Sequence, residues 1–360
     1  MKLRNLIAMS LTLLMGVSAT FRPYAQAPAD AGRKSDGQGY RVYGVAFYNL
    51  ENLFDTINNN GRYDLEFSPK GGKKWDGHKY KNKLKNLATV ISDLKTETTP
   101  LGPAIVGVSE VENKSVLDDL VATEPLRKLG MKVVHHDSPD LRGVDVGLLY
   151  NPRLFQVINV TNHRLNIEGQ PNFKTRDQIC VVGLLEGSRV AVIVNHWPSR
   201  RGGAKSSYLR EAAADLTKSI ADSLHKIDPN MGVIVMGDLN DDPHDISVSK
   251  NLGALHDAKD VRKGGFFNPF WQKLDQGFGS YVYRNSWDLF DQIIVDYNLV
   301  NGSTGLEYVD AVVHNKPYLI QQEGQYKDTP LRTFASDVWL NGYSDHLPTE
   351  IFLRKKVMKP

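Results

Sequence analysis

Short polar motifs stand at the ends of apolar runs along this chain, and they constrain its fold more than any other feature. Six motifs offer Asn, Asp, Glu or His where a strand would end, at 47–52, 108–113, 194–201, 236–240, 291–295 and 344–348. Apolar runs build sheets, so the polar side chains at their ends can converge on one rim. Carboxylate and amide oxygens suit hard divalent cations, and histidines beside carboxylates suit proton transfer. The pattern indicates metal-assisted hydrolysis, most naturally of a phosphate ester.

The order of expected elements is mixed, with hairpin-like strand pairs beside strand–helix units. Strands are expected at 42–48, 104–108, 144–150, 179–185, 190–194, 233–236, 289–295 and 350–353, and helices at 79–94, 116–129 and 208–227. This order predicts a single α+β domain with mostly antiparallel sheets and helices outside. The aromatic region 257–288 is the least regular and reads as a long surface insertion, a plausible substrate-contact segment.

The N-terminus reads as a secretory signal peptide. Lys2 and Arg4 precede a short apolar stretch, and Ala25-Gln26-Ala27 has the small-x-small form of a cleavage site. We therefore expect a signal peptide at 1–27, a flexible leader at 28–40, one catalytic domain at 41–354 and a C-terminal tail at 355–360. The protein is expected to be exported and soluble, in the periplasm or outside the cell.

Charge and cysteine content exclude two classes of protein. Three of the 44 Lys and Arg residues lie in 1–27, so 41 remain against 41 Asp and Glu. A neutral mature chain is not a generally basic nucleic-acid binder, and phosphate must be attracted by local patches. The lysine-rich stretch 70–85 could contact a nucleic-acid backbone, although a solvated helix face is the more ordinary explanation. The single cysteine, Cys180, excludes an internal disulfide.

Four residues at strand ends are candidates for the metal and water chemistry. Glu110 follows an apolar run, so its carboxylate must be exposed, paired or metal-bound, and metal ligation is the first interpretation. Asn49 ends the first expected strand, where an amide can orient a metal-bound water or a phosphate oxygen. Asp238 and Asn240 share one face at strand spacing, so both can reach a phosphate or an attacking water.

Two histidines are candidates for proton transfer and phosphate contact. His196 follows an apolar strand and has Arg200 and Arg201 close by, whose guanidinium groups suit phosphate oxygens. His346 stands near the C-terminus, and Asp291, inside an apolar segment, needs a partner. Asp291 is therefore the expected orienting carboxylate of a His346 dyad.

These motifs together resemble the endonuclease/exonuclease/phosphatase superfamily, which is deoxyribonuclease I-like. The residues that match its signature, in the same order, are Asn49, Glu110, His196, Asp238, Asn240, Asp291, Asp345 and His346. The segment Asn-Leu-Glu-Asn-Leu-Phe-Asp at 49–55 is similar to that of exported bacterial members. The resemblance implies a four-layer α/β sandwich, with two mostly antiparallel β-sheets face to face and helices on the outside.

The resemblance also implies roles for the metal-site residues. Glu110 would bind the divalent metal, supported by Asn49 and Asp345. Asp238 and Asn240 would hold and polarise the attacking water and the scissile phosphate. The expected metal is Mg²⁺, although oxygen ligands also accept Mn²⁺ or Ca²⁺.

For the histidines, the resemblance implies that His346, oriented by Asp291, acts as a general base or as a phosphate-stabilising imidazolium. His196 would lie close to a leaving or non-bridging oxygen. Attack on phosphorus would be in line, with the metal and the histidines offsetting the developing negative charge.

Three further residues are candidates for substrate binding. Arg142 and Asp145 occupy the region where relatives place a further site residue, and the alternative for Asp145 is a simple ion pair with Arg142. Arg176 is either another phosphate contact or an ordinary surface charge.

The expected activity is that of an exported metal-dependent phosphodiesterase, in the first place a nuclease acting on DNA or RNA. The same site would also serve a phospholipid or sphingomyelin phosphodiesterase, which recognises a lipid headgroup, or an inositol-phosphate phosphatase. A lipid-acting enzyme should expose an apolar hairpin, and the segment 266–271 is the candidate. A binding protein on an inactive scaffold is the remaining alternative, and no obligate protein partner is indicated.

Overall fold

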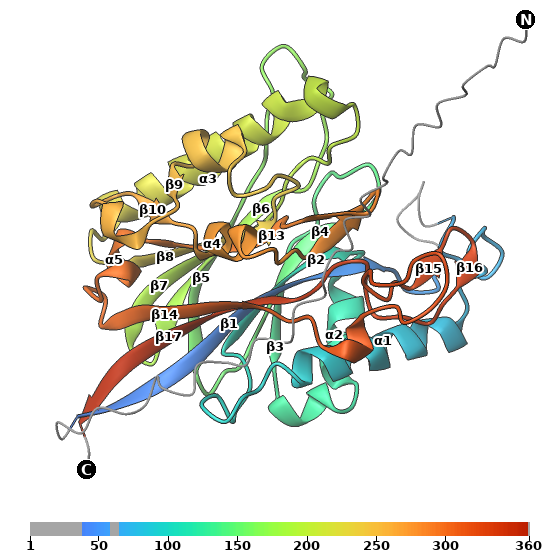
Figure 1. The fold of residues 1–360 in the computed structure, drawn as a ribbon, viewed down its shortest axis with the longest axis horizontal. Helices are drawn as coiled ribbons and strands as arrows, with labels where there is room; N and C mark the ends of the chain where they lie inside the picture. The colour runs from blue at the N-terminus through green and yellow to red at the C-terminus, as the bar shows by residue number, and fades with distance from the viewer. Residues whose placement is uncertain (1–37, 58–64, 359–360) are drawn as a thin grey trace, which may run out of the picture.

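Two β-sheets lie face to face between outer layers of helices (Figure 1). The computed structural model describes residues 38–57 and 65–358. The expected signal peptide at 1–27 therefore lies outside the described residues. The layered arrangement confirms the predicted four-layer fold.

The first sheet has six strands, and every neighbouring pair is antiparallel except β1 and β2, which run parallel. Its strands, in spatial order, are β14 (Leu306–Val313), β17 (Thr349–Met358), β1 (Gln38–Leu53), β2 (Ile105–Val111), β4 (Asp145–Tyr150) and β3 (Lys132–His135). The central strand β2 is apolar over most of its length because both of its faces are covered.

The second sheet has seven strands, with parallel pairs at β7–β8 and β9–β10. Its strands, in spatial order, are β5 (Phe155–His163), β6 (Gln178–Leu185), β7 (Ser188–His196), β8 (Gly232–Asp238), β13 (Asp291–Asp296), β10 (Phe266–Phe267) and β9 (Ala254–Leu255). The expected hairpin of β6 and β7 is confirmed, and its turn is Glu186-Gly187. Two short hairpins lie outside the sheets: β11 (Tyr281–Tyr283) with β12 (Ser286–Asp288), and β15 (Phe334–Ala335) with β16 (Val338–Trp339).

The helices of the described residues are α1 (Gly77–Ser92), α2 (Lys114–Ala122), α3 (Ser207–Ile227), α4 (Pro269–Asp275) and α5 (Tyr297–Val300). Helices α1 and α2 lie outside the first sheet and α3 lies outside the second, whereas α4 and α5 contact both β14 of the first sheet and β13 of the second (Figure 1). Helix α1 starts at Asp76, whose carboxylate accepts the Lys79 N–H at 3.0 Å and so caps the helix. Helix α3 packs its small residues Ala213, Ala214 and Ala221 into the apolar outer face of the second sheet.

Close packing between strands depends on two glycines. A Cβ added at Gly107 on β2 would lie 2.3 Å from the Met236 sulfur on β8, so the two sheets touch here. A Cβ added at Gly237 would lie 2.3 Å from the Asn195 carbonyl oxygen. The second contact is with backbone, which cannot give way, so glycine at 237 lets β7 and β8 approach just before Asp238.

Two strands extend a few residues beyond the domain limits of 41–354 that the sequence suggested. Strand β1 begins at Gln38, inside the predicted leader 28–40, and β17 continues to Met358, inside the predicted tail 355–360. Strands β1 and β17 are antiparallel neighbours, and their register pairs Gln38 with Met358. Their pairing therefore extends beyond the apolar residues of the two strands. Side-chain patterning could not reveal this extension, because Lys355 and Lys356 look like a solvated tail.

The helix predicted at 116–129 is also shorter than expected. It ends at Ala122, and a separate 3₁₀ turn, Leu126–Leu129, follows Pro125. Proline lacks an N–H and clashes with the preceding turn, so the helix ends before Pro125 although the apolar pattern of the sequence continues.

The region 257–288, which we expected to be a long surface insertion, is in part built into the second sheet and the core. This region forms strand β10 of the second sheet, which pairs with β9, and then helix α4 and the β11–β12 hairpin. Phe266, Phe267 and Phe270 are buried, so the proposed membrane-docking segment 266–271 is wrong: its apolar side chains belong to the core. Elements this short have no readable period. Over the described ranges, no helix combines the length and the apolar composition that crossing a membrane requires.

Candidate active site

Strand ends from both sheets meet at one rim. The register places His196 on β7 beside Asp238 on β8, and Asp238 beside Asp291 on β13. Across to the first sheet, the Asn49 amide on β1 donates a hydrogen bond to Asp238 Oδ2 at 3.0 Å. The convergence that the sequence motifs predicted is therefore present in the structure.

His346 and Asp291 form a buried pair. His346 Nδ1 lies 2.7 Å from Asp291 Oδ2, and the same oxygen accepts the Ser280 hydroxyl at 2.5 Å. Tyr281 stacks on the imidazole with ring centroids 4.7 Å apart, which fixes the plane of the ring. Since Nδ1 faces a carboxylate, Nε2 is the nitrogen turned toward Asp238, whose Oδ2 lies 3.8 Å away. The expected contact between His346 and Asp291 is confirmed.

The carboxylates around His346 favour its charged form. Burial alone would lower the pKa of this imidazole, but Asp291, Asp238 and Asp345 together outweigh burial and raise the pKa well above its ordinary value. The surroundings of His346 therefore favour the imidazolium form at neutral pH, which can donate from Nε2.

His196 has the opposite preference. Its Nε2 lies 3.6 Å from Asp238 Oδ2. Burial and the nearby cations Arg176, Arg142 and His346 lower the pKa of His196 well below its ordinary value, so this ring is neutral. The two histidines of the site therefore differ in charge.

Asp238 is the carboxylate shared by this group. Burial raises its pKa to about 6; the positive charge of His346 opposes this, whereas Asp291 and Glu110 add to it. Its Oδ1 accepts the Asn240 N–H at 3.0 Å. A carboxylate with a pKa this close to neutrality can take up a proton from water and release it again.

A pocket of about 500 Å³ opens over these residues. The predicted site residues that line it are Glu110, Arg142, His196, Arg200, Arg201, Asp238, Asn240, Asp345 and His346. Asn49 and Asp291 lie behind this wall and contact Asp238 and His346 respectively. Asn240 turns its amide to the Trp197 carbonyl at 3.0 Å and lies on the left-handed backbone, with φ 51°.

Glu110, Asp345 and Asn49 fit a hard divalent cation by the chemistry of their oxygen donors. Glu110 adopts the left-handed backbone, with φ 60°, which turns its side chain toward the pocket. Asn49 Oδ1 accepts the Glu51 N–H at 2.9 Å and keeps a second lone pair. Burial would raise the pKa of Glu110, but Arg142, with His346 and Arg176, outweighs burial and holds the pKa below its usual value. Glu110 is thus an anion ready to bind a cation.

The four predicted arginine contacts differ in what they do. Arg142 lines the pocket while its guanidinium donates to Glu110 at 3.0 Å and to Asn52 Oδ1 at 2.5 Å. Arg176 does not line the pocket: its guanidinium donates to the His196 carbonyl at 3.1 Å and to the Trp197 carbonyl at 2.6 Å. The substrate-binding assignment of Arg176 is therefore corrected to a brace for the chain that follows β7.

Arg200 and Arg201 both reach the pocket. Arg200 stacks over the Phe290 ring at 4.6 Å and pairs with Asp241 at 3.2 Å, with Asp242 at 3.3 Å and with Asp245. These contacts fix the guanidinium but also neutralise much of its charge. Arg201 is exposed at the pocket mouth and is the better placed of the two to meet a phosphate.

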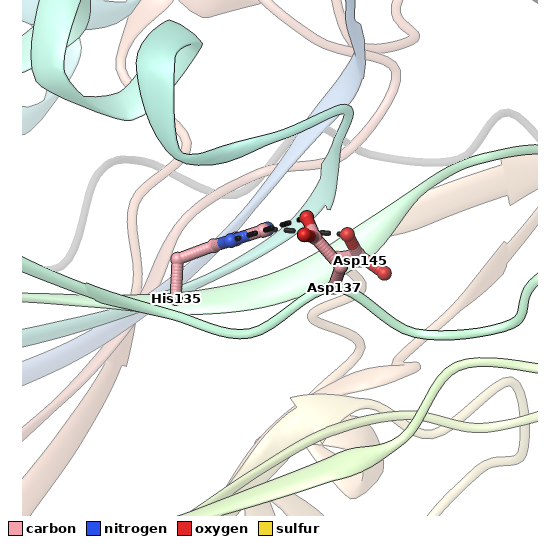
Figure 2. Close-up of side chains that lie close together, drawn as sticks. All are labelled: His135, Asp137 and Asp145. Carbon is pink, nitrogen blue, oxygen red and sulfur yellow. Dashed lines mark ion pairs between the residues drawn. The ribbon is translucent and has the colours of Figure 1, made fainter. Parts of the chain in front are cut away.

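Asp145 was a candidate for substrate binding, but it does not line the pocket. It pairs with His135 Nε2 at 3.1 Å, and Asp137 approaches the other ring nitrogen at 3.8 Å, as Figure 2 shows. Its second oxygen accepts the Ser138 N–H at 2.9 Å. Asp145 therefore closes the loop that carries Arg142. It does not form an ion pair with Arg142, and it does not line the substrate pocket. Its position inside a motif gave no hint of this, because the partner lies on another strand.

Three lysines of the stretch 70–85 are engaged within the protein, whereas Lys70, Lys74, Lys81 and Lys85 are exposed. Lys73 pairs with Asp337 at 3.1 Å, Lys79 donates to the Lys73 carbonyl at 2.8 Å, and Lys83 is buried. These three side chains are unsuited to a nucleic-acid contact.

Several pocket residues were missed as individuals by the sequence motifs: Ser199, Tyr281, Tyr283, Asp288 and Phe290. Most belong to the β11–β12 hairpin and the strand that follows it. The signal was the aromatic composition of 257–288, which favoured substrate contact, but composition cannot say which rings face a pocket and which enter the core.

Asp288→Asn is expected to raise the melting temperature at pH 8 and to leave it unchanged below pH 4. Burial raises the pKa of Asp288 from 3.8 to about 6, reinforced by Asp242 and opposed by Arg200. The folded state then holds more protons than the unfolded state between these values, so its stability falls as pH rises through that window. Asparagine mimics the protonated form and removes the loss.

Thermal unfolding at both pH values is the measurement, with Asp260→Asn, an exposed aspartate, as the control. An Asp288→Asn gain that is equal at both pH values would contradict the assignment, because it would not depend on ionisation.

Comparison with known proteins supports the fold found here. A model described as the Endonuclease/Exonuclease/phosphatase family matches residues 44–355. No protein of curated function matches the sequence. Among solved structures, D. rerio TDP2 complexed with a single-strand DNA product is similar at 14% identity and a TM-score of 0.53, over 87% of this chain and 98% of that chain.

Two Bacteroides thetaiotaomicron structures are similar to the same extent. A mannosyl-6-phosphatase has 16% identity and a TM-score of 0.53, over 86% of this chain and 99% of that chain. An endonuclease/exonuclease/phosphatase family protein has 14% identity and a TM-score of 0.53, over 88% of this chain and 98% of that chain. At these identities the likeness is one of fold.

Proposed function

The chain belongs to the endonuclease/exonuclease/phosphatase family, whose members are metal-dependent phosphoric ester hydrolases, and we propose that it is an exported phosphodiesterase acting on nucleic acid. The observation that carries the proposal is the pocket in which the His346–Asp291 pair, Asp238 and Glu110 meet. Oxygen ligands for a cation, a proton donor and a proton acceptor lie together there, as metal-assisted phosphate-ester hydrolysis requires. Export rests on the signal-like sequence at 1–27.

Asp238 is the proposed general base. Its carboxylate is held by Asn49 at 3.0 Å and by the Asn240 N–H at 3.0 Å, so its orientation is fixed before substrate binds. Its pKa of about 6 leaves it ionised at neutral pH and still basic enough to take a proton from water. Asn240, beside it in the pocket, would hold the same water or a phosphate oxygen.

His346 is the proposed donor to the phosphate. As an imidazolium it offers the Nε2 proton to a non-bridging or leaving oxygen, while Asp291 keeps Nδ1 occupied. Neutral His196 adds a hydrogen bond to the same group. The donors converge where negative charge develops, which lowers the barrier because they are oriented before the reaction.

A divalent cation held by Glu110 with Asn49 and Asp345 would supply Lewis-acid stabilisation of the phosphate. Mg²⁺ is the proposed ion, and Mn²⁺ and Ca²⁺ suit the same oxygens. Arg142 already neutralises Glu110 from the other side, so the chain's own charges limit repulsion between this carboxylate and an incoming phosphate.

Nucleic acid is the proposed substrate because aromatic and cationic side chains flank the reactive group. Tyr283 is 54% exposed at the tip of the β11–β12 hairpin, and Arg201 lies at the mouth of the same pocket. An exposed ring beside a guanidinium can stack a base while its phosphate is held. Single-stranded DNA or RNA suits this pocket better than a lipid, since segment 266–271 is buried.

A small phosphate monoester, such as a sugar or inositol phosphate, is the second candidate. The pocket volume of about 500 Å³ is that of a site for one small molecule. The similar mannosyl-6-phosphatase shares the fold with this chain and favours the same candidate.

The deciding experiment offers purified residues 28–360 single-stranded DNA, RNA, plasmid DNA, sphingomyelin liposomes and sugar or inositol phosphates, each with Mg²⁺ or EDTA. Metal-dependent cleavage of nucleic acid supports the proposal. Release of phosphate from monoesters alone would replace the substrate and keep the site, and no turnover of any ester would overturn the enzyme assignment.

Tyr283→Ala is expected to raise KM for a single-stranded oligonucleotide by about tenfold, because base stacking on an aromatic ring contributes on the order of 1–3 kcal/mol. The value of kcat should change little, since Tyr283 does not contact the His346–Asp291 pair. Tyr283→Phe keeps the ring and should behave as the unmodified protein in steady-state kinetics. Equal KM values for the alanine and phenylalanine variants would contradict base stacking.

A further inference from the structure

A lysine of helix α1 is buried among polar groups close to the residues proposed to bind the metal. Lys83 projects from α1 and is only 1% exposed. Its ammonium donates to the Thr333 hydroxyl at 2.6 Å and to the Tyr343 carbonyl at 2.7 Å, and it lies 3.6 Å from Glu51 Oε2. Burying an ammonium is costly, so a lysine is rarely found at such a place unless its partners are fixed.

Glu51 supplies the carboxyl group of this cluster. It lies on β1 two residues after Asn49, on a left-handed backbone with φ 48°. Its Oε2 accepts both the Thr333 N–H, at 2.7 Å, and the Thr333 hydroxyl, at 2.6 Å. Lys83, Glu51 and Thr333 therefore form a closed triangle that joins α1, β1 and the chain before β17.

The same triangle is tied directly to the site. Lys83 holds the carbonyl of Tyr343, and the next residue, Ser344, donates its hydroxyl to the Asn49 carbonyl at 2.7 Å. That hydroxyl also accepts the His346 N–H at 3.1 Å. The segment that presents Asp345 and His346 is thus held against β1 from two points, one of them the ammonium of Lys83.

We propose that Lys83 is a positioning residue for the divalent-cation site: it clamps the Asp345 segment against β1, so that Asp345 and Asn49 stand where they can share a cation with Glu110. The inference rests on the proposed metal-dependent function. Lys83 touches no substrate and acts only through Glu51, Thr333 and Tyr343.

Electrostatics and positioning make opposite predictions for this lysine. Removing a positive charge near a cation site, by itself, strengthens cation binding. Removing a clamp that orients ligands weakens it, by about 10–100-fold for groups that support metal ligands. If Lys83 had a purely structural role, its substitution would lower the stability of the protein and leave the cation affinity unchanged.

The test is the apparent dissociation constant for Mn²⁺ and for Mg²⁺, taken from the rise in melting temperature with cation concentration and without any substrate. Lys83→Met is expected to weaken both constants by about 10–100-fold. Lys85→Met, an exposed lysine of the same helix, is the matched control and should leave them unchanged. Unchanged or tighter cation binding in Lys83→Met would overturn the proposal.

Thr333→Val is the second variant, in case the buried methionine prevents folding. Valine keeps the shape of threonine while removing the hydroxyl that joins Lys83 to Glu51, and a several-fold weaker cation affinity is expected. Affinity equal to that of the unmodified protein would overturn the proposal as well. If the unmodified protein itself shows no cation-dependent shift, the metal site of the proposed function fails, and the clamp fails with it.

Discussion

His346→Ala is expected to lower the rate of phosphate-ester hydrolysis by about 10²–10⁴-fold at saturating metal, the usual contribution of a positioned proton donor or acceptor. The imidazolium is the group that Asp291, Asp238 and Tyr281 fix in place, and its neighbour His196 has a lowered pKa and is therefore a weaker source of a proton at neutral pH. Single-turnover kinetics with the best substrate is the measurement, because it separates chemistry from product release.

Asp291→Asn provides an independent check of the same pair. Asp291 is a principal cause of the raised pKa of His346, so removing its charge should move the loss of activity at high pH to a lower pH. His256→Ala is the matched control, because that histidine also pairs with a carboxylate, Asp275 at 2.9 Å, but lies on the surface away from the pocket. A full rate in His346→Ala would remove this residue from the chemistry.

Much of the fold and of the pocket was predictable because apolar runs and strand ends are local features. His196, Asp238 and Asp291 each follow or begin such a run, and the sheet register brings the three side by side. Their order along the chain also carried the family resemblance. The burial of a strand and the residue at which it ends can both be read from the sequence of that strand alone.

The partners of charged residues were not predictable in the same way. Asp145 meets His135 on a neighbouring strand, and Arg176 meets the carbonyls that follow β7. Lys83 looked like one more lysine on a solvated helix face, yet its partners lie 250 and 260 residues further along the chain. Contacts of this kind depend on how the layers stack, and no local pattern encodes them.

Glu110→Gln is the other substitution with a large expected effect. It keeps the shape of the side chain and removes the charge that pairs with Arg142 at 3.0 Å. Losing a ligand should weaken divalent-cation affinity by at least about 100-fold, since even groups that only support ligands contribute about 10–100-fold. The melting-temperature rise with Mn²⁺ and the hydrolysis rate as a function of Mn²⁺ concentration are the measurements.

Glu112→Gln separates ligation from structure, because Glu112 lies two residues after Glu110 and does not line the pocket. Glu112 is buried and accepts the Asp55 N–H at 2.7 Å, so its loss should lower stability while cation affinity is retained. High Mn²⁺ should restore part of the activity of Glu110→Gln and none of that of His346→Ala, since only the first variant has a binding defect. If Glu112→Gln instead lost cation affinity and Glu110→Gln kept it, the metal would be held at Glu112, and the pocket described here would not be its site.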